Sequence, residues 1–178
     1  DSGFYVGTWA SNVSFGEVSM EWDLYVGYAG SITEDVGYDL SYIRFEYPGL
    51  GSELDYNEFH AILNWGDFSF GLGYSPDYLG LNNVAWWYPN ASYTLGLPSE
   101  TSLKFTLGYS MLDDNSAEDF TDLFGGEEIL DWSVTYTIPT AGVYLGIGVV
   151  GTDIGKNKCL GGDKACSTRA VVSLSKSL

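Results

Sequence analysis

The sequence predicts an all-β protein: an antiparallel, up-and-down transmembrane β-barrel with about ten strands, short periplasmic turns and long extracellular loops. Three observations predict it. Apolar side chains recur at every second residue in segment after segment. The connections between these segments alternate between short and long, and the positions between the apolar ones carry polar residues or glycine. A chain of 178 residues is one domain in size, so residues 1–178 are expected to form a single barrel.

Composition excludes several other classes of protein. The 24 acidic and 7 basic residues give a formal net charge of −17, which would repel nucleic-acid phosphates, so no nucleic-acid partner is expected. A 45% apolar and 16% aromatic content argues against disorder. The sequence contains no run of 18 apolar residues, so no transmembrane helix is predicted. The 23 glycines and the many aromatic residues disfavour helices in general.

The first strand signal is the segment 3–11, in which the sequence does not decide which alternate set faces which side. The segment 38–47 shifts its apolar positions from Leu40 and Tyr42 to Ile43 and Phe45, which predicts a β-bulge. Clear alternation marks residues 19–30, 67–75, 102–110, 130–138 and 142–150, and weaker alternation marks residues 56–65, 88–97 and 168–178. Together these segments give the ten expected strands.

The connections carry as much information as the strands. Short links are expected at residues 66–67, 97–100 and 139–142, and long ones at 76–83, 111–127 and 153–167. Tight turns at one end and long loops at the other are typical of outer-membrane barrels.

The two faces of the strands predict a membrane barrel rather than a soluble one. Unpaired carboxylates cannot fill a dry core, so the apolar face is expected to point outward to lipid. A soluble sandwich with one wet face is the alternative. Aromatic residues near the ends of the apolar rows predict interfacial girdles. The predicted girdle residues are Trp22, Tyr28, Trp65, Phe68, Tyr74, Tyr109, Trp132 and Tyr136.

The polar face predicts the lining of a pore. Its expected lining residues are Glu21, Asp23, Asp39, Glu58, His60, Lys104, Asp131 and Arg169, and Arg44 is also assigned to the interior. Carboxylates around a narrow opening stabilise cations, so the prediction is a porin-like channel for passive diffusion of small solutes or cations. The alternative is a structural or partner-binding barrel whose lumen is plugged, with Tyr25, Tyr88 and Tyr144 filling much of it.

No catalytic residue, cofactor or metal site is predicted. The only histidine, His60, lies in the middle of an expected strand, where it does not suit a Ser-His-Asp arrangement. The motif GIGVVG at 146–151 lies inside an expected strand and precedes no helix, so it is not a dinucleotide fingerprint. The acidic segment 111–128 could collect divalent cations and bridge to lipopolysaccharide, but a solvated acidic loop is favoured.

The two cysteines, Cys159 and Cys166, flank six residues of a Gly/Lys-rich stretch. A disulfide between them is predicted and would indicate an oxidising compartment, with two unpaired loop thiols as the alternative. Two cysteines are too few for a structural zinc site.

The segments GFYVGTWASNVSF, VGYDLSYIRFEYPG, DYNEFHAILNWGDFSFGLGYS and RAVVSLSKS resemble the TorF-type porin family, a conserved hypothetical outer-membrane family of proteobacteria. The resemblance covers nearly the whole chain. It implies a barrel in the outer membrane of a Gram-negative bacterium, in contact with the lipid bilayer and lipopolysaccharide, with a poorly defined transport function. A membrane-protein partner or a homo-oligomer is a further expectation.

Members of that family usually carry one more hairpin ahead of the GFYVG block. The resemblance therefore implies twelve strands in the complete family member, against about ten in this chain. Family members also usually end in an aromatic residue, whereas this chain ends in Leu178.

Overall fold

A computed structural model describes residues 2–15, 18–49, 54–81, 84–113, 128–155 and 166–176. Ten β-strands and two 3-10 turns make up the regular structure of these residues. The strands are β1 (Phe4–Phe15), β2 (Val18–Ser31), β3 (Val36–Glu46), β4 (Tyr56–Trp65), β5 (Phe68–Ser75), β6 (Trp86–Gly96), β7 (Ser102–Leu112), β8 (Glu128–Thr140), β9 (Val143–Thr152) and β10 (Arg169–Ser175). The turns are η1 (Tyr78–Gly80) and η2 (Pro98–Glu100).

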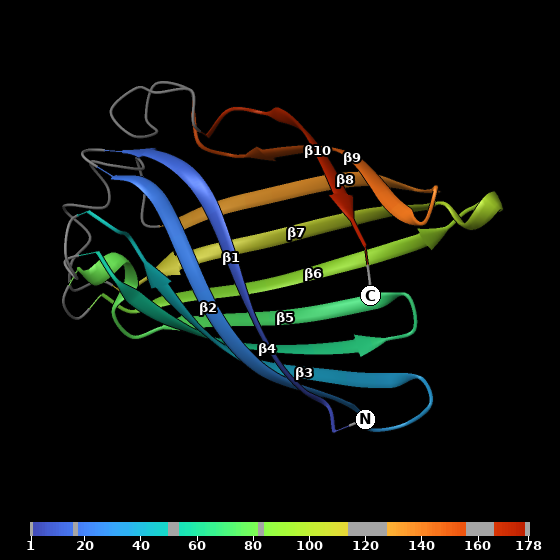
Figure 1. Cartoon of the computed structure of the whole chain (residues 1–178), viewed down its shortest axis with the longest axis horizontal. Helices are drawn as coiled ribbons and strands as arrows, with labels where there is room; N and C mark the ends of the chain where they lie inside the picture. Colours follow the sequence, from blue (N-terminus) through green and yellow to red (C-terminus); the bar gives the residue numbers. More distant parts are fainter. Residues whose placement is uncertain are drawn as a thin grey trace.

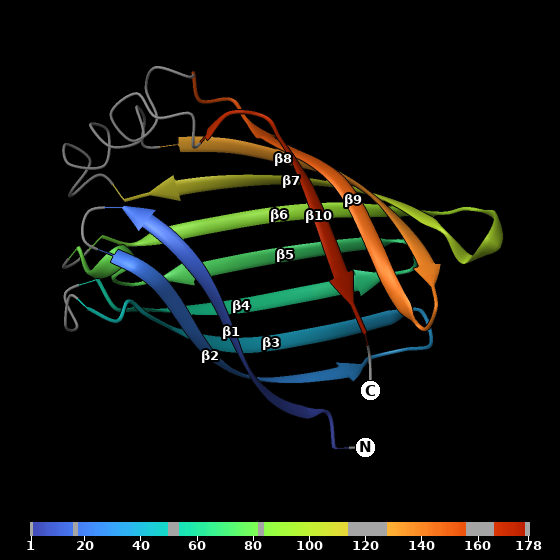
Figure 2. The same cartoon turned by 45° about the horizontal axis from the view of Figure 1, so that its top comes forward.

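Each strand pairs antiparallel with the next one along the chain, which gives one sheet in the order β1 to β10. The sheet curls strongly about its long direction (Figures 1 and 2). Within the described residues no ladder joins the two edge strands, β1 and β10. The predictions of an all-β fold, of ten strands and of up-and-down topology are confirmed.

Connections at the two ends of the sheet differ in length. The links at one end are residues 32–35, 66–67, 97–101 and 141–142. Gly66 and Gly142 adopt positive φ angles of 55° and 80°, which the tight two-residue hairpins at this end require. The links at the other end are residues 16–17, 47–55, 76–85, 113–127 and 153–168. The predicted alternation therefore holds, except that β1 and β2 are joined by a short link at the long-connection end.

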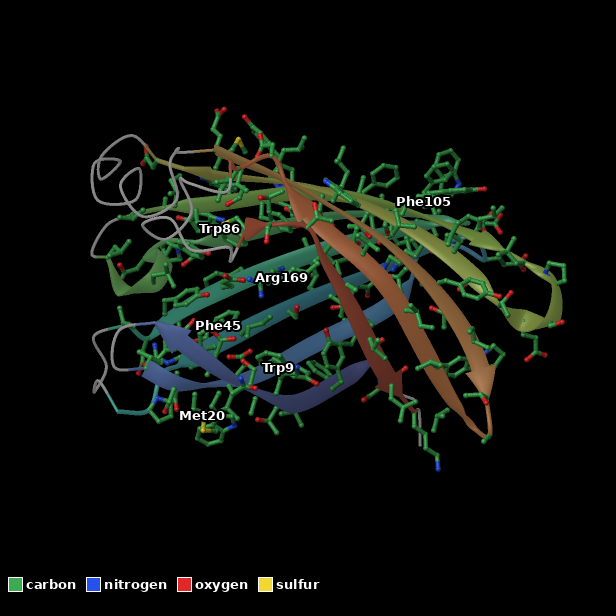
Figure 3. The ribbon with its side chains drawn as sticks, turned by 90° about the horizontal axis from the view of Figure 1, so that it is seen from above. Trp9, Met20, Phe45, Trp86, Phe105 and Arg169 are labelled. Atoms are coloured by element: carbon green, nitrogen blue, oxygen red, sulfur yellow. The ribbon has the colours of Figure 1, made fainter. Side chains whose placement is uncertain are left out.

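The ladders keep alternate residues on opposite faces across the whole sheet. Trp22, Leu72, Leu107 and Trp132 share the outer face and are 36–53% exposed. Asp23 and Glu58 lie on the inner face and are only 7% and 5% exposed. Figure 3 shows Met20 and Phe105 outside the curl and Phe45 and Trp86 inside it. The apolar set thus faces outward and the polar set inward.

Two expectations for β3 are wrong. No bulge interrupts this strand, because its ladders with β2 and β4 both run in continuous register. Ile43 and Phe45 instead point inward, where Phe45 stacks on Tyr56 with ring centroids 4.6 Å apart. Arg44 shares the outer face with Leu24, so it does not belong to the interior, and its guanidinium pairs with Asp55 at 2.9 Å.

The interior at the long-connection end has its own small core. One cluster contains Val84, Trp86 and Leu112, and a second contains Val18, Tyr47 and Tyr56. Tyr78 and Leu79 pack against both clusters. None of the helical turns in the described ranges is long or apolar enough to cross a membrane.

Candidate functional site: the inner face of the sheet

The ladders place all eight predicted lining residues on the inner face, although their role in a pore stays a prediction. On β2, Glu21 and Asp23 alternate with outward residues. On β4, His60 pairs with Ser41 of the inner face of β3, so His60 and Glu58 face inward too. Gly108 pairs with Asp131, and Arg169 pairs with Val150. Asp39 accepts a hydrogen bond from the Tyr5 hydroxyl at 2.6 Å. Lys104 lies between Thr94 and Thr135 on the same face.

Three carboxylates, Glu21, Asp23 and Glu58, gather on β2 and β4, and we call them the acidic cluster. The Tyr47 hydroxyl donates to Glu21 Oε2 at 2.6 Å. His60 Nε2 donates to Glu58 Oε2 at 2.7 Å. Asp23 Oδ1, by contrast, is buried and has no hydrogen-bond partner among the described residues. Two members of the cluster are thus held by a neighbour and one is not.

An aromatic row fills the interior beside this cluster. It runs through Phe45, Tyr56, Tyr78, Trp86 and Tyr88, with consecutive ring centroids 4.6, 5.2, 5.1 and 5.4 Å apart. Burial, reinforced by the nearby charges of Glu58 and Glu21, raises the pKa of Tyr78 above its ordinary value. The row occupies the part of the inner face formed by β3 to β6.

The connection between β3 and β4 contributes Tyr47 beside this row. Burial and the hydrogen bond to Glu21 raise the pKa of Tyr47, so its hydroxyl stays protonated and keeps donating. Sequence reasoning missed both Tyr47 and Tyr78. Tyr47 ends the expected strand 38–47 and Tyr78 lies in the expected long connection 76–83, and neither was assigned to the inner face. The signal available was a large aromatic residue at the end of one expected strand and another in the long connection 76–83.

The other half of the inner face, on β7 to β10, carries small residues, and we call it the small-residue wall. Its inward positions include Thr106, Gly108, Ser133, Thr135, Gly146, Gly148 and Ser173. A cavity of about 430 Å³ lies against it and is bordered by Asp131, Ser133 and Arg169. Figure 3 shows Arg169 projecting into the space enclosed by the curl.

Tyr88 joins the two halves. Its hydroxyl lies 3.0 and 2.9 Å from the two carboxylate oxygens of Asp131, to which it donates. A Cβ atom at Gly108 would collide with the Tyr88 ring and with Asp131, so the glycine is what allows this ring to lie flat on β7. The hydroxyl that ends the aromatic row therefore holds a carboxylate of the small-residue wall.

The outer face presents aromatic side chains near both ends of the strands. Trp22, Tyr74, Tyr109 and Trp132 lie toward the long connections, and Tyr28, Trp65, Phe68 and Tyr136 lie toward the short ones. Trp87 and Tyr93 also face outward, and they contact Tyr74 and Phe68 with centroids 4.3 and 4.9 Å apart. Sequence reasoning missed both, although Trp87, Pro89, Ala91 and Tyr93 are every second residue of one strand and therefore share a face.

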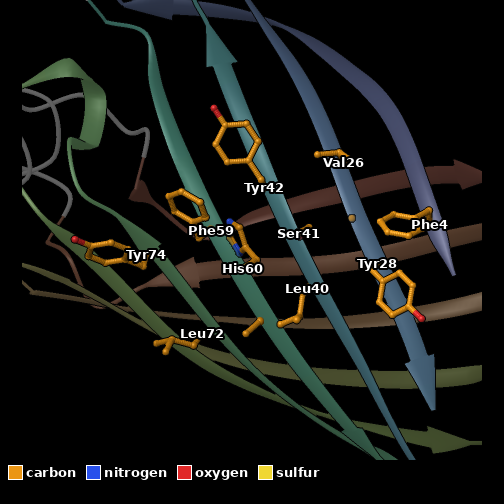
Figure 4. A pocket seen from close by; sticks show the side chains of 12 residues that line it. Phe4, Val26, Tyr28, Leu40, Ser41, Tyr42, Phe59, His60, Leu72 and Tyr74 are labelled. Carbon is orange, nitrogen blue, oxygen red and sulfur yellow. The ribbon is translucent and has the colours of Figure 1, made fainter. Parts of the chain in front are cut away.

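A groove of about 510 Å³ crosses the outer face of β1 to β5 (Figure 4). Its apolar lining includes Tyr28, Leu40, Phe59 and Leu72, and His60 of the inner face also borders it. Extended exposed apolar surfaces of this kind mark contacts with proteins or membranes.

Two sequence predictions fall partly outside the described residues. Cys159 lies outside them, so the disulfide with Cys166 stays a prediction. Residues 114–127 of the acidic segment lie outside them as well. Within the described ranges, no group of three or more His, Cys, Asp or Glu side chains is arranged to hold a metal ion. The motif at 146–151 lies within β9.

An antiparallel up-and-down sheet with a polar inner face and an apolar outer face defines the class of this protein. The profile of Gcw_chp, a family of bacterial proteins of unknown function, matches residues 1–178, and the chain belongs to this family. No curated protein and no solved structure gives a significant match. The predicted bacterial origin agrees with this family, whereas the TorF-type and porin identities stay predictions.

Proposed function

We propose that the sheet is the wall of a β-barrel in the outer membrane of a Gram-negative bacterium, and that small solutes or cations diffuse passively along its inner face. The observation that carries this proposal is the separation of the two faces. Leu72 and Leu107 are 42% and 53% exposed on the outside, whereas Asp23 and Glu58 are buried on the inside. Water would favour the reverse arrangement, and hydrocarbon favours this one.

Closure of the barrel is part of the proposal. An unpaired strand edge costs several kcal/mol per polar group in hydrocarbon, so β1 and β10 need partners in a bilayer. The two strands run antiparallel, and Val6 and Val172 both face outward, so pairing β1 with β10 would keep the faces matched. An additional hairpin between them, as the resemblance implies, would give twelve strands.

The path is proposed to follow the small-residue wall. Glycine, serine and threonine leave space between β7 and β10, and the cavity beside Asp131 and Arg169 lies along it. Carboxylates on the inner face and the net charge of −17 favour cations over anions.

A barrel with a plugged lumen is the second candidate. The observation that favours it is the aromatic row, in which Tyr78 stacks on Trp86 with ring planes 9° apart and contacts Tyr56 on its other side. If these rings and the long connections close the interior, the protein would serve as a structural or partner-binding barrel.

Reconstitution in planar bilayers separates the two candidates. The channel proposal predicts discrete conductance steps with a reversal potential that favours K⁺ over Cl⁻ in a KCl gradient. A folded, heat-modifiable protein that inserts without conductance, and that releases no small sugar from liposomes, would contradict the channel and support the plugged barrel.

A further inference from the structure

Two residues of opposite charge border the cavity beside the small-residue wall. Asp131 of β8 and Arg169 of β10 both line this space of about 430 Å³. Asp131 is partly buried and Arg169 is exposed, so a molecule that enters the cavity can reach both side chains. Figure 3 shows Arg169 projecting into the space enclosed by the curl. The cavity therefore offers a negative and a positive group to the same occupant.

The strand register holds the two charged residues apart. Asp131 pairs with Thr152 of β9, whereas Arg169 pairs with Val150 of the same strand, so β9 lies between them. Neighbouring strands are about 4.8 Å apart, which separates β8 from β10 by roughly 10 Å. The Tyr88 hydroxyl donates to the Asp131 carboxylate, 2.9 Å from its nearer oxygen, and keeps that group in place. A small molecule can thus lie between a carboxylate and a guanidinium that different strands supply.

The cavity lies at the end of the sheet that carries the long connections. Thr152 is the last residue of β9 and Arg169 is the first residue of β10, and both border the cavity. In the proposed barrel this end faces outside the cell, as the long loops of such barrels do. A solute that diffuses inward would therefore meet Asp131 and Arg169 before it reaches the rest of the small-residue wall.

We propose that this cavity is a binding site for small zwitterions, with α-amino acids as the solute class. The inference rests on the proposed channel, whose solute it names. Asp131 binds the ammonium group of the solute, and Arg169 binds its carboxylate through the paired N–H donors of the guanidinium. An anion is attracted by Arg169 but repelled by Asp131, and a cation meets the reverse. A molecule that carries both charges satisfies the two groups together.

The rest of the lining suits a solute with a polar side chain. Thr106 of β7 and Ser133 of β8 border the cavity and bring hydroxyl groups, which both donate and accept hydrogen bonds. The volume of about 430 Å³ lies in the range of small-molecule sites, about 300–1,000 Å³. L-Glutamine, a zwitterion with an amide side chain, is therefore the probe for the test.

Isothermal titration calorimetry of the folded, detergent-solubilised protein tests the site without requiring conductance. The wild type should bind L-glutamine. Two analogues each lack one charge, since glutaramic acid has no ammonium group and 4-aminobutanamide has no carboxylate. Each should bind roughly tenfold or more weakly, because it loses one set of charge-assisted hydrogen bonds. Equal binding of all three compounds would overturn the zwitterion assignment.

Variants locate the bound solute. Asp131→Asn and Arg169→Gln each remove one charge and should weaken L-glutamine binding by roughly tenfold or more. Glu100→Gln and Lys176→Gln remove the same charges outside the strands and should leave binding unchanged. Ser133→Trp fills the cavity without removing a charge and should also abolish binding, which keeps the test decisive if a charge variant does not fold. Unchanged binding in folded Asp131→Asn and Arg169→Gln, or in folded Ser133→Trp, would overturn the site.

A planar-bilayer measurement on the same protein separates the site from the channel. In a conducting wild type, L-glutamine should lower the current as it occupies the path. Conductance without any binding of L-glutamine would overturn the site and leave the channel standing. Binding without conductance would overturn the channel and leave a solute-binding barrel. Absence of both would overturn both.

Discussion

The two halves of the interior differ although their outer walls are alike. Strands β3 to β6 enclose the aromatic row, in which each ring contacts the next from Phe45 to Tyr88. Strands β7 to β10 turn glycine, serine and threonine inward and border a cavity of about 430 Å³. On the outside, Leu72 of the first half and Leu107 of the second are both well exposed.

This difference shows that separate physical requirements determine which residues occupy the outer face and which occupy the inner face. A uniform apolar exterior is what hydrocarbon would require at every strand of the proposed barrel. The interior is free to vary around the curl, so one half can be filled by rings that pack on each other while the other half keeps open space. Any route through the molecule is then expected along the small-residue wall.

Removal of the ring at the centre of the aromatic row should have the largest effect. Tyr78→Ala deletes a ring that contacts Tyr56 and Trp86 and should cost about 3–5 kcal/mol of unfolding free energy, as for other large-to-small changes in a core. Denaturant unfolding in detergent measures it. Tyr144→Ala, at a 48% exposed inward position of β9, is the control and should cost far less. Equal costs would mean that the row is not a core.

A charge on the outer face should cost the same in both halves. Leu72→Arg and Leu107→Arg each place a guanidinium near the middle of a strand and should each cost about 2–4 kcal/mol in a bilayer. Folding equilibria measured in lipid vesicles check this. Thr106→Arg, next to Leu107 but inward, is the matched control and should be tolerated. A penalty confined to one half would show that the outer faces are not equivalent.

Loss of the Tyr47 hydroxyl should have a smaller effect. Tyr47→Phe removes a hydrogen bond to the Glu21 carboxylate and should cost about 2 kcal/mol. The raised pKa of Tyr47 means that its contribution is complete below its ordinary value of 10.0 and falls at higher pH, as the unfolded phenol ionises. The variant should therefore lose less stability than the wild type above that pH. Parallel pH profiles would contradict the assignment.

A bulky residue on the small-residue wall should have the smallest energetic effect but a direct functional one. Ser133→Trp fills the cavity beside Asp131 and should lower single-channel conductance by roughly tenfold. Val134→Trp adds the same ring to the outer face and should leave conductance unchanged. If the two variants conduct equally, the route does not follow this wall.

The strands and their facing were predictable because both follow from a period of two. Alternation alone was enough to assign Trp22 to the outer face and Asp23 to the inner face. The ladders of β2 with β1 and β3 keep the same two faces on the neighbouring strands. In β3 the same reasoning failed. Both Ile43 and Phe45 face the interior, where Phe45 belongs to the aromatic row and Ile43 lies between Tyr25 and Glu58. Alternation cannot distinguish an apolar residue of the interior from one of the outer face.

The contacts that organise the inner face were not predictable. Tyr47 and Tyr78 reach it from connections, and their partners Glu21 and Trp86 lie far away in sequence. Within the described part of the chain, Asp23 Oδ1 has no hydrogen-bond donor, whereas the nearby donors Tyr47 and His60 bond to Glu21 and Glu58. Such facts arise from the three-dimensional arrangement of several strands, which local residue patterns do not encode.

Collision accessibility of spin labels tests the central claim most directly. Leu107→Cys and Thr106→Cys, each made in a chain with Cys159 and Cys166 replaced by serine, are labelled with a nitroxide and reconstituted in lipid vesicles. The account predicts that the label at 107 collides mainly with molecular oxygen, which concentrates in hydrocarbon, and that the label at 106 collides mainly with a water-soluble nickel chelate. The opposite pattern, or nickel accessibility at both positions, would contradict an outer face that meets lipid.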